Sequence, residues 1–155
     1  MAKARDVPLS GGLSFNEAAR RTIAIRASEV FEHSEGVLDM RDIERVHDMR
    51  VATRRLRAAL EIFAACFPKR DHRAALRDVK QLADALGERR DRDVAIASLE
   101  RAVTQLSGDD RPGIRHLIAQ LRAEQEAANE SLAACLAAVE RDGLEQRLAA
   151  LAEAR

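Results

Sequence analysis

Apolar residues recur every three to four positions along this 155-residue chain, which is the spacing of amphipathic helices. The pattern predicts five helices, at about residues 15–34, 40–66, 71–106, 112–140 and 144–154. Glycine, proline and short polar runs separate these segments, as is typical of helix ends and loops. Because loops this short join antiparallel neighbours, we expect an all-α fold, an antiparallel four-helix bundle with a short extra C-terminal helix.

Individual residues mark where these helices begin and end. The run Ser14–Glu17 has the form of a capping box for the first helix. The second helix is expected to end before Pro68, and an aspartate just before Pro112 is expected to cap the fourth. The Ala- and Leu-rich terminal helix is a candidate for packing on a partner instead of on its own domain.

Composition narrows the class of protein. Hydrophobic residues make up 46% and charged residues 34%, which is a globular balance. Four Phe and no Trp or Tyr are too few rings for a surface that stacks single-stranded nucleic acid. No apolar stretch approaches the length of a membrane span, and residues 1–13 lack the apolar core of a signal peptide. We expect a flexible leader over residues 1–13 and a single helical domain over 14–155.

The two cysteines indicate the redox compartment. Cys66 and Cys135 occupy apolar helical positions far apart in the chain, and no CxxC motif is present. This pattern is typical of small buried thiols in a reducing compartment, and a disulfide between the two cysteines is the alternative. We therefore expect a cytoplasmic protein.

Charge is unevenly distributed, although the net charge is zero. Residues 41–90 hold 13 Lys and Arg against 8 Asp and Glu, whereas residues 91–155 hold 8 against 12. All but three of the 26 cations are Arg, whose planar guanidinium grips phosphate oxygens with two parallel hydrogen bonds. A GC-rich genome would also produce an excess of Arg, but it would not explain where the Arg residues lie.

The second predicted helix carries a row of cations beside its apolar stripe. At 100° per residue, four chargeable side chains fall within about 80° of one another: His47, Arg50, Arg54 and Arg57. Like charges at this spacing repel, so a polyanion held along the row is the simplest explanation. The alternative is a solvated face with intrahelical ion pairs, such as Arg57 with Glu61, each worth roughly a few tenths of a kcal/mol.

The third predicted helix adds a second cationic stripe, formed by Arg73, Arg77 and Lys80. If the second and third helices are antiparallel neighbours, both rows face one groove. Arg90 falls near the core stripe, where a partly buried guanidinium needs a carboxylate partner. We expect Asp93 or Asp48 to be that partner and to aim the remaining N–H groups of Arg90.

Other chemistries have little support in the sequence. Glu44 and His47 form one Glu-x-x-His unit, but the di-metal sites of helical bundles need two such units. The other histidines show no ligand spacing, and there is no Gly-rich phosphate loop and no nucleophile with an adjacent base. We therefore expect no catalytic residue, no metal and no cofactor. His47 is either a structural residue or a donor to phosphate.

Two segments resemble the signature stretches in the N-terminal half of the CHAD domain, the conserved histidine α-helical domain family. They are VHDMRVATRRLRAALEIF at residues 46–63 and LGERRDRDVAIASLE at residues 86–100. The resemblance covers roughly residues 14–140. It implies a helical bundle whose basic surface or cavity binds inorganic polyphosphate without catalysis, often at polyphosphate granules.

The resemblance also implies which residues bind. It implies that Arg90 contacts or positions the phosphate chain and that Asp93 orients Arg90. From the first segment it implies the binding residues His47, Arg50, Arg54, Arg55 and Arg57. To these we add, from helical geometry alone, Arg73, Arg77 and Lys80.

The chain departs from the family pattern because it has one histidine-bearing basic helix, whereas a full domain has two similar four-helix halves. A homodimer that completes the missing half is therefore an expected partner; the alternatives are weaker binding on an open face and a truncated product. Family members are often fused to, or encoded near, CYTH-type triphosphate hydrolases, so a CYTH-type protein is a second expected partner. No membrane partner is expected, and near-neutral charge with few aromatics argues against nucleic acid. The alternative functions are an oligomerising helical scaffold and an enzyme acting on phosphate chains.

Overall fold

A computed structural model describes residues 3–153, and no strand occurs among them. The helices are α1 (Phe15–Glu32), α2 (Ile43–Ile62), the short 3-10 turn η1 (Ala64–Cys66), α3 (Lys69–Val103), α4 (Arg111–Arg141) and α5 (Leu144–Glu153). The five predicted helices are present, and the predicted all-α class is confirmed. Within the described residues, no helix has both the length and the apolar character needed to cross a membrane.

The helix ends follow local sequence signals with one exception. The Ser14 hydroxyl accepts a hydrogen bond from the Glu17 N–H, and the Glu17 carboxylate accepts one from the Ser14 N–H, which confirms the capping box. At α4, Pro112 lies in the first turn as predicted, but Asp110 makes no capping hydrogen bond. Its carboxylate accepts a hydrogen bond from the Ser107 hydroxyl instead, at 2.8 Å.

Helix α2 is shorter at both ends than its apolar pattern predicts. Asp42 accepts a hydrogen bond from the Glu44 N–H and so starts the helix at Ile43. After Ile62 the chain tightens into η1 and then becomes extended at Phe67, the residue before a proline. The apolar rhythm therefore continues beyond the helix itself.

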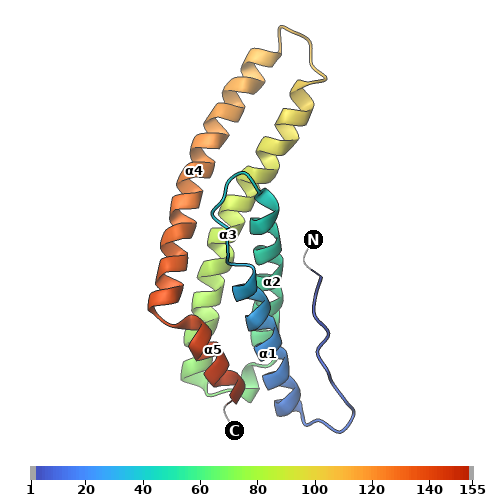
Figure 1. Ribbon diagram of the computed structural model, residues 1–155, viewed down its shortest axis with the longest axis vertical. Coiled ribbons are helices and arrows are strands. Elements are labelled where there is room, and N and C mark those ends of the chain that lie inside the picture. Colours follow the sequence, from blue (N-terminus) through green and yellow to red (C-terminus); the bar gives the residue numbers. More distant parts are fainter. Residues whose placement is uncertain (1–2, 154–155) are drawn as a thin grey trace.

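Helices α3 and α4 form a long antiparallel hairpin whose far end extends beyond the rest of the molecule (Figure 1). Helix α2 packs along the half of α3 nearer to the α2–α3 turn, and α1 packs against α2. Helix α5 folds back at Gly143, whose φ of 64° suits a glycine, and lies against α1 and α3. The helical bundle is therefore completed by the short terminal helix.

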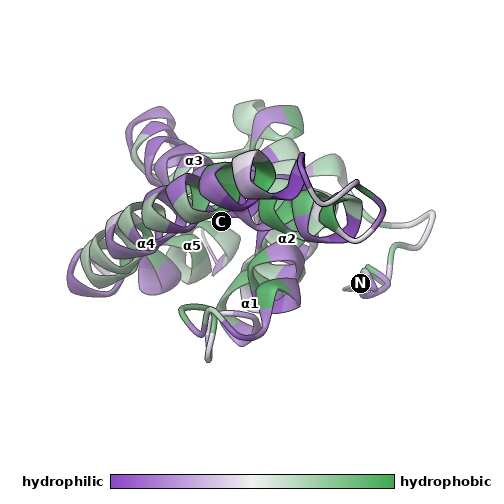
Figure 2. Cartoon of the chain, turned by 90° about the horizontal axis from the view of Figure 1, so that it is seen from above, coloured by the Kyte–Doolittle hydropathy of each residue, from purple (hydrophilic) through white to green (hydrophobic). Residues whose placement is uncertain are grey.

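The core fills the space between the helices, where hydrophobic positions turn toward one another (Figure 2). Each of the five α-helices contributes fully buried side chains, among them Ile23, Val30, Met49, Leu56, Leu60, Val79, Leu82, Leu86, Leu132, Leu144 and Leu148. Leu144, Leu148 and Leu151 bury the apolar face of α5 in its own domain. The interpretation that this helix packs on a partner is therefore wrong.

The described part of the predicted leader, residues 3–13, contacts α1, and residues 1–2 lie outside the described residues. The Arg5 backbone N–H donates to the Glu29 carboxylate at 2.6 Å, and the Arg5 guanidinium donates to Glu32. Arg21 of α1 donates to the Pro8 carbonyl at 3.0 Å. These bonds tie the leader to the first helix, and its flexibility in solution stays a prediction.

Both cysteines are free thiols, but neither is fully buried. Cys66 and Cys135 are half-buried at the edge of the core. Burial, followed by the nearby Asp78 carboxylate, raises the pKa of the Cys135 thiol above its usual value. The thiol therefore stays protonated at neutral pH.

Candidate functional site

The two cationic rows lie on neighbouring antiparallel helices, α2 and α3 (Figure 1). In the first half of α2, Arg50 reaches α3 at Gly87, where an added Cβ atom would lie 3.8 Å from the Arg50 Nε. Near the end of α2, the Lys80 ammonium lies 3.5 Å from the Glu61 carboxylate. Contacts at both ends thus place the rows along one surface. We call it the basic face; it consists of His47, Arg50, Arg54, Arg57, Lys69, Arg70, Arg73, Arg77, Lys80 and Arg90.

A shallow groove of about 650 Å³ lies where the middle of α3 passes the first half of α2. We call it the mid-helix groove, and it is lined by His47, Arg50, Arg90, Asp91, Val94, Ala95 and Ser98. On α2, the neighbouring Val46 and Met49 are buried in the core, which turns His47 and Arg50 toward the groove. The groove therefore brings an imidazole and two guanidinium groups together at a solvent-accessible surface.

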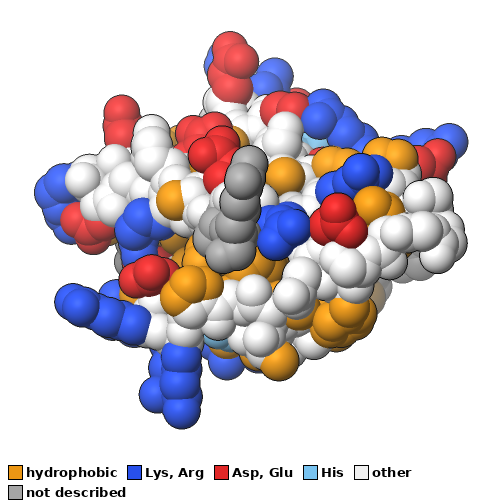
Figure 3. Space-filling model, turned by 90° about the horizontal axis from the view of Figure 1, so that it is seen from below, with side chains coloured by type: hydrophobic (Ala, Val, Ile, Leu, Met, Phe, Trp, Pro, Cys, Tyr) orange, Lys and Arg blue, Asp and Glu red, His pale blue; other side chains and the backbone are white. Residues whose placement is uncertain are grey.

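A second shallow groove, of about 690 Å³, lies at the start of α3. We call it the turn groove, and it is lined by Lys69, Arg70, Arg73, Ala74 and Arg77. Figure 3 looks onto the end of the molecule at which α3 begins, and Lys and Arg side chains project from its margin. Sequence reasoning missed Lys69 and Arg70, although they lie one turn before Arg73 on the same side of the helix.

Part of the basic face is neutralised by the protein itself. The Arg57 Nε lies 3.1 Å from the Glu61 carboxylate, which also faces Lys80. The Arg57 guanidinium holds the pKa of Glu61 below its usual value. Arg77 donates to Asp78 at 3.0 Å. The solvated ion-pair alternative therefore describes this part of the face.

Other cations of the basic face have no such partner. Arg50, Arg54 and Arg73 make no hydrogen bond or ion pair to any residue that the structure describes. Lys69 and Arg70 likewise make no side-chain hydrogen bond or ion pair to any of residues 3–153. These five cations are the ones available to an anion from solution.

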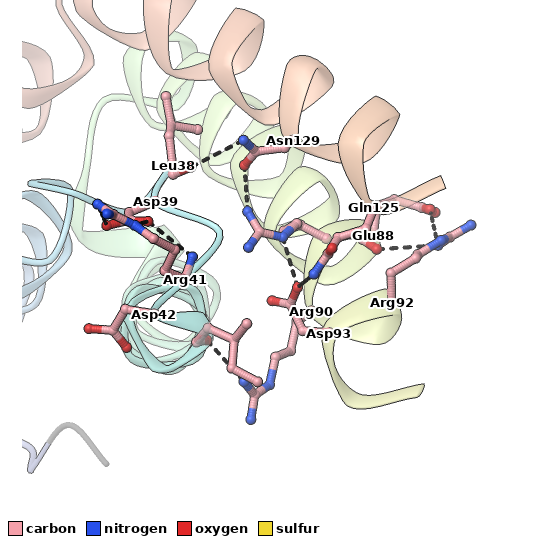
Figure 4. Close-up of polar contacts among 12 residues, drawn as sticks. Leu38, Asp39, Arg41, Asp42, Glu88, Arg90, Arg92, Asp93, Gln125 and Asn129 are labelled. Carbon is pink, nitrogen blue, oxygen red and sulfur yellow. Dashed lines mark hydrogen bonds and ion pairs between the residues drawn. The ribbon is translucent and has the colours of Figure 1, made fainter. Parts of the chain in front are cut away.

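Arg90 lies toward α2, not toward Asp93 as the sequence suggested (Figure 4). Its guanidinium donates to the Ile43 carbonyl at 3.0 Å and to the Glu44 carboxylate at 3.3 Å. These bonds hold the start of α2 against α3. Arg90 therefore lines the mid-helix groove and also holds α2, one wall of the groove, in place. The prediction that Arg90 pairs with Asp93 is wrong.

Asp93 is instead the partner of Arg89, and both side chains are completely buried. The Arg89 Nε donates to Asp93 at 2.8 Å, and Gln125 of α4 donates to the same carboxylate at 2.6 Å. Arg89 also donates to Asn129, which in turn donates to the Leu38 carbonyl at 3.2 Å (Figure 4). This buried cluster joins α3 to α4 and to the loop that precedes α2.

The chain matches the CHAD domain family over residues 21–155. It belongs to the CHAD domain family. The match begins later than the expected residue 14 and extends beyond the expected residue 140. No protein with a curated description and no solved structure matches the chain.

The two CHAD signature segments meet at the mid-helix groove. His47 and Arg50 come from the first segment and Arg90 from the second, and Arg54 follows one turn along α2. Arg55 lies about 140° around α2 from Arg50, so the fold does not bring it to the basic face. It is half-buried and has an interaction of its own.

The histidines and acids form no metal cluster within residues 3–153, where no group of three or more His, Cys, Asp or Glu side chains is placed to hold an ion. Glu44 of the Glu-x-x-His unit is engaged by Arg90. His72 is buried, with Nε2 2.7 Å from the Leu60 carbonyl oxygen. His72 therefore has a structural role.

Proposed function

We propose that this CHAD domain binds inorganic polyphosphate along the basic face and does not hydrolyse it. The main support is that three guanidinium groups of this face have no anionic partner among the described residues; they belong to Arg50, Arg54 and Arg73. Arg50 and Arg54 lie one turn apart on α2 and repel each other, so a bound polyanion relieves an unfavourable arrangement. Membership of the CHAD family supports the same ligand, because the signature resemblance implies polyphosphate.

A linear phosphate chain suits such a surface. Its phosphates carry about one negative charge each, and cations three to four residues apart on a helix are separated by about 5–6 Å. Each guanidinium can give paired hydrogen bonds to phosphate oxygens, with a net contribution of about 1.5–3 kcal/mol for a charged hydrogen bond. The ligand has no bases to stack, so the absence of Trp and Tyr is no disadvantage.

Binding of long-chain polyphosphate and of duplex DNA at equal charge concentration, over a salt series, tests the proposal. We expect tighter binding of polyphosphate at every salt concentration. Its affinity should fall steeply with salt, because binding releases counterions. Equal affinity for the two polymers, or no affinity for polyphosphate at low salt, would contradict the proposal.

The other two functions predict different results in the same samples. An enzyme acting on phosphate chains would release inorganic phosphate after addition of Mg²⁺ or Mn²⁺, whereas we expect none. An oligomerising scaffold would show a higher mass in sedimentation without any affinity for a polyanion. A homodimer or a CYTH-type partner would add a second basic wall, and sedimentation with and without polyphosphate tests the homodimer.

A further inference from the structure

The basic face contains two grooves, and they are far apart along α3. On α3, Arg73 lies in the turn groove and Arg90 in the mid-helix groove. Because α3 is one unbroken helix, the 17 positions from Arg73 to Arg90 correspond to about 25 Å. A short phosphate oligomer cannot contact both grooves at once.

The surface between the two grooves is acidic as well as basic. The Glu61 carboxylate faces Arg57 at 3.1 Å and Lys80 at 3.5 Å, so it already occupies the cations of this middle part. Asp84 lies one turn beyond Lys80 on the same side of α3, is exposed, and has no ion pair to any described residue. A phosphate placed here would meet two carboxylates.

Each groove contains cations without a protein anion; the mid-helix groove also contains the exposed carboxylate of Asp91, against the two guanidinium groups of Arg50 and the adjacent Arg54. Arg50 in the mid-helix groove has no ion pair to a described residue, and the same is true of Lys69, Arg70 and Arg73 in the turn groove. At about 6 Å in water, the repulsion between a phosphate and one carboxylate weakens binding roughly threefold. Phosphate is therefore favoured in each groove and disfavoured between them.

We propose that the basic face holds two separate phosphate-binding sites, one in each groove, divided by the carboxylates of Glu61 and Asp84. This inference rests on the proposed function and specifies how the binding surface is divided into sites. A short chain binds each site independently. A long chain that occupies both sites must cross the acidic middle part, where it displaces Glu61 from Arg57 and Lys80.

Calorimetric titration with tripolyphosphate tests the number of sites. We expect two equivalents to bind the full chain at low salt. Arg70→Ala/Arg73→Ala should remove one equivalent and Arg50→Ala/Arg54→Ala the other. The matched control Arg101→Ala/Arg115→Ala, at the far end of the α3–α4 hairpin, should retain both equivalents.

The variant Glu61→Gln/Asp84→Asn tests separately whether these two carboxylates divide the sites. We expect this variant to bind two equivalents of tripolyphosphate as before and to bind long-chain polyphosphate about three- to tenfold more tightly. A single equivalent in the full chain, or no gain with the long chain, would overturn the two-site arrangement while polyphosphate binding stands. If neither short nor long chains bind, the proposed function itself is wrong.

Discussion

Replacing Asp93 with alanine is expected to lower the free energy of unfolding by about 3–5 kcal/mol, because it leaves the Arg89 guanidinium buried without its counter-charge. Both side chains are 0% exposed, so water cannot replace the lost carboxylate without opening the α3–α4 interface. The pair is already incompletely hydrogen-bonded, because Arg89 Nη2 and Asp93 Oδ2 have no hydrogen-bond partner in the described part of the chain. Urea unfolding followed by circular dichroism measures the change.

Asp91→Ala is the matched control for this experiment. Asp91 is an exposed acid two positions away on the same helix, so we expect a change within about 0.5 kcal/mol. The double variant Arg89→Met/Asp93→Leu removes both charges and should recover most of the lost stability. A loss below about 1 kcal/mol for Asp93→Ala would contradict the role assigned to the pair.

Replacing Arg50 and Arg54 together with alanine is expected to weaken polyphosphate binding roughly 100-fold or more, since each lost charged hydrogen bond contributes about 1.5–3 kcal/mol. Neither guanidinium has a partner among the described residues, so the loss falls on the ligand and not on the fold. The plot of log affinity against log salt should become shallower by about 0.7–0.9 for each lost phosphate contact. Fluorescence anisotropy of labelled polyphosphate measures both quantities.

The variant Arg101→Ala/Arg115→Ala removes the same charge from outside the basic face. Both residues are exposed, on the far half of the α3–α4 hairpin. We expect less than about a threefold change in affinity, because Arg101 lies 11 positions, or about 16 Å, along α3 from Arg90, the nearest cation of the basic face on that helix, and charges beyond a Debye length of about 10 Å are screened. Equal losses in the two double variants would show that only total charge matters and would contradict binding at the basic face.

Most of the fold could be predicted because local signals fix its helices. The Ser14 capping box and the glycine and proline interruptions mark helix ends whatever the neighbours are. The place of α5 could not be predicted, because an Ala- and Leu-rich stripe fits any apolar surface. Its turn at Gly143 and the space beside α1 direct Leu144 and Leu148 into the domain's own core.

The residues of the candidate site could be predicted where helical periodicity alone sets the direction of a side chain. They could not be predicted where packing against another helix sets it. Arg89 and Arg90 lie about 100° apart on the two flanks of one apolar stripe, so the sequence does not tell which is buried. The neighbouring helices determine which of the two is buried. Helix α4 provides Gln125 and Asn129 as partners for the Arg89–Asp93 pair, whereas α2 provides a backbone carbonyl for Arg90. Arg55 belongs to the signature segment, but its helical angle takes it away from the basic face.

The position of polyphosphate on the protein tests the central claim most directly, and it can be read from NMR signals of the arginine Nε–Hε groups during a polyphosphate titration. We predict that the signals of Arg50, Arg54 and Arg73 shift while those of Arg101 and Arg115 stay in place. If the largest shifts occur at Arg101 and Arg115, or if no arginine signal moves, the basic face is not the binding surface.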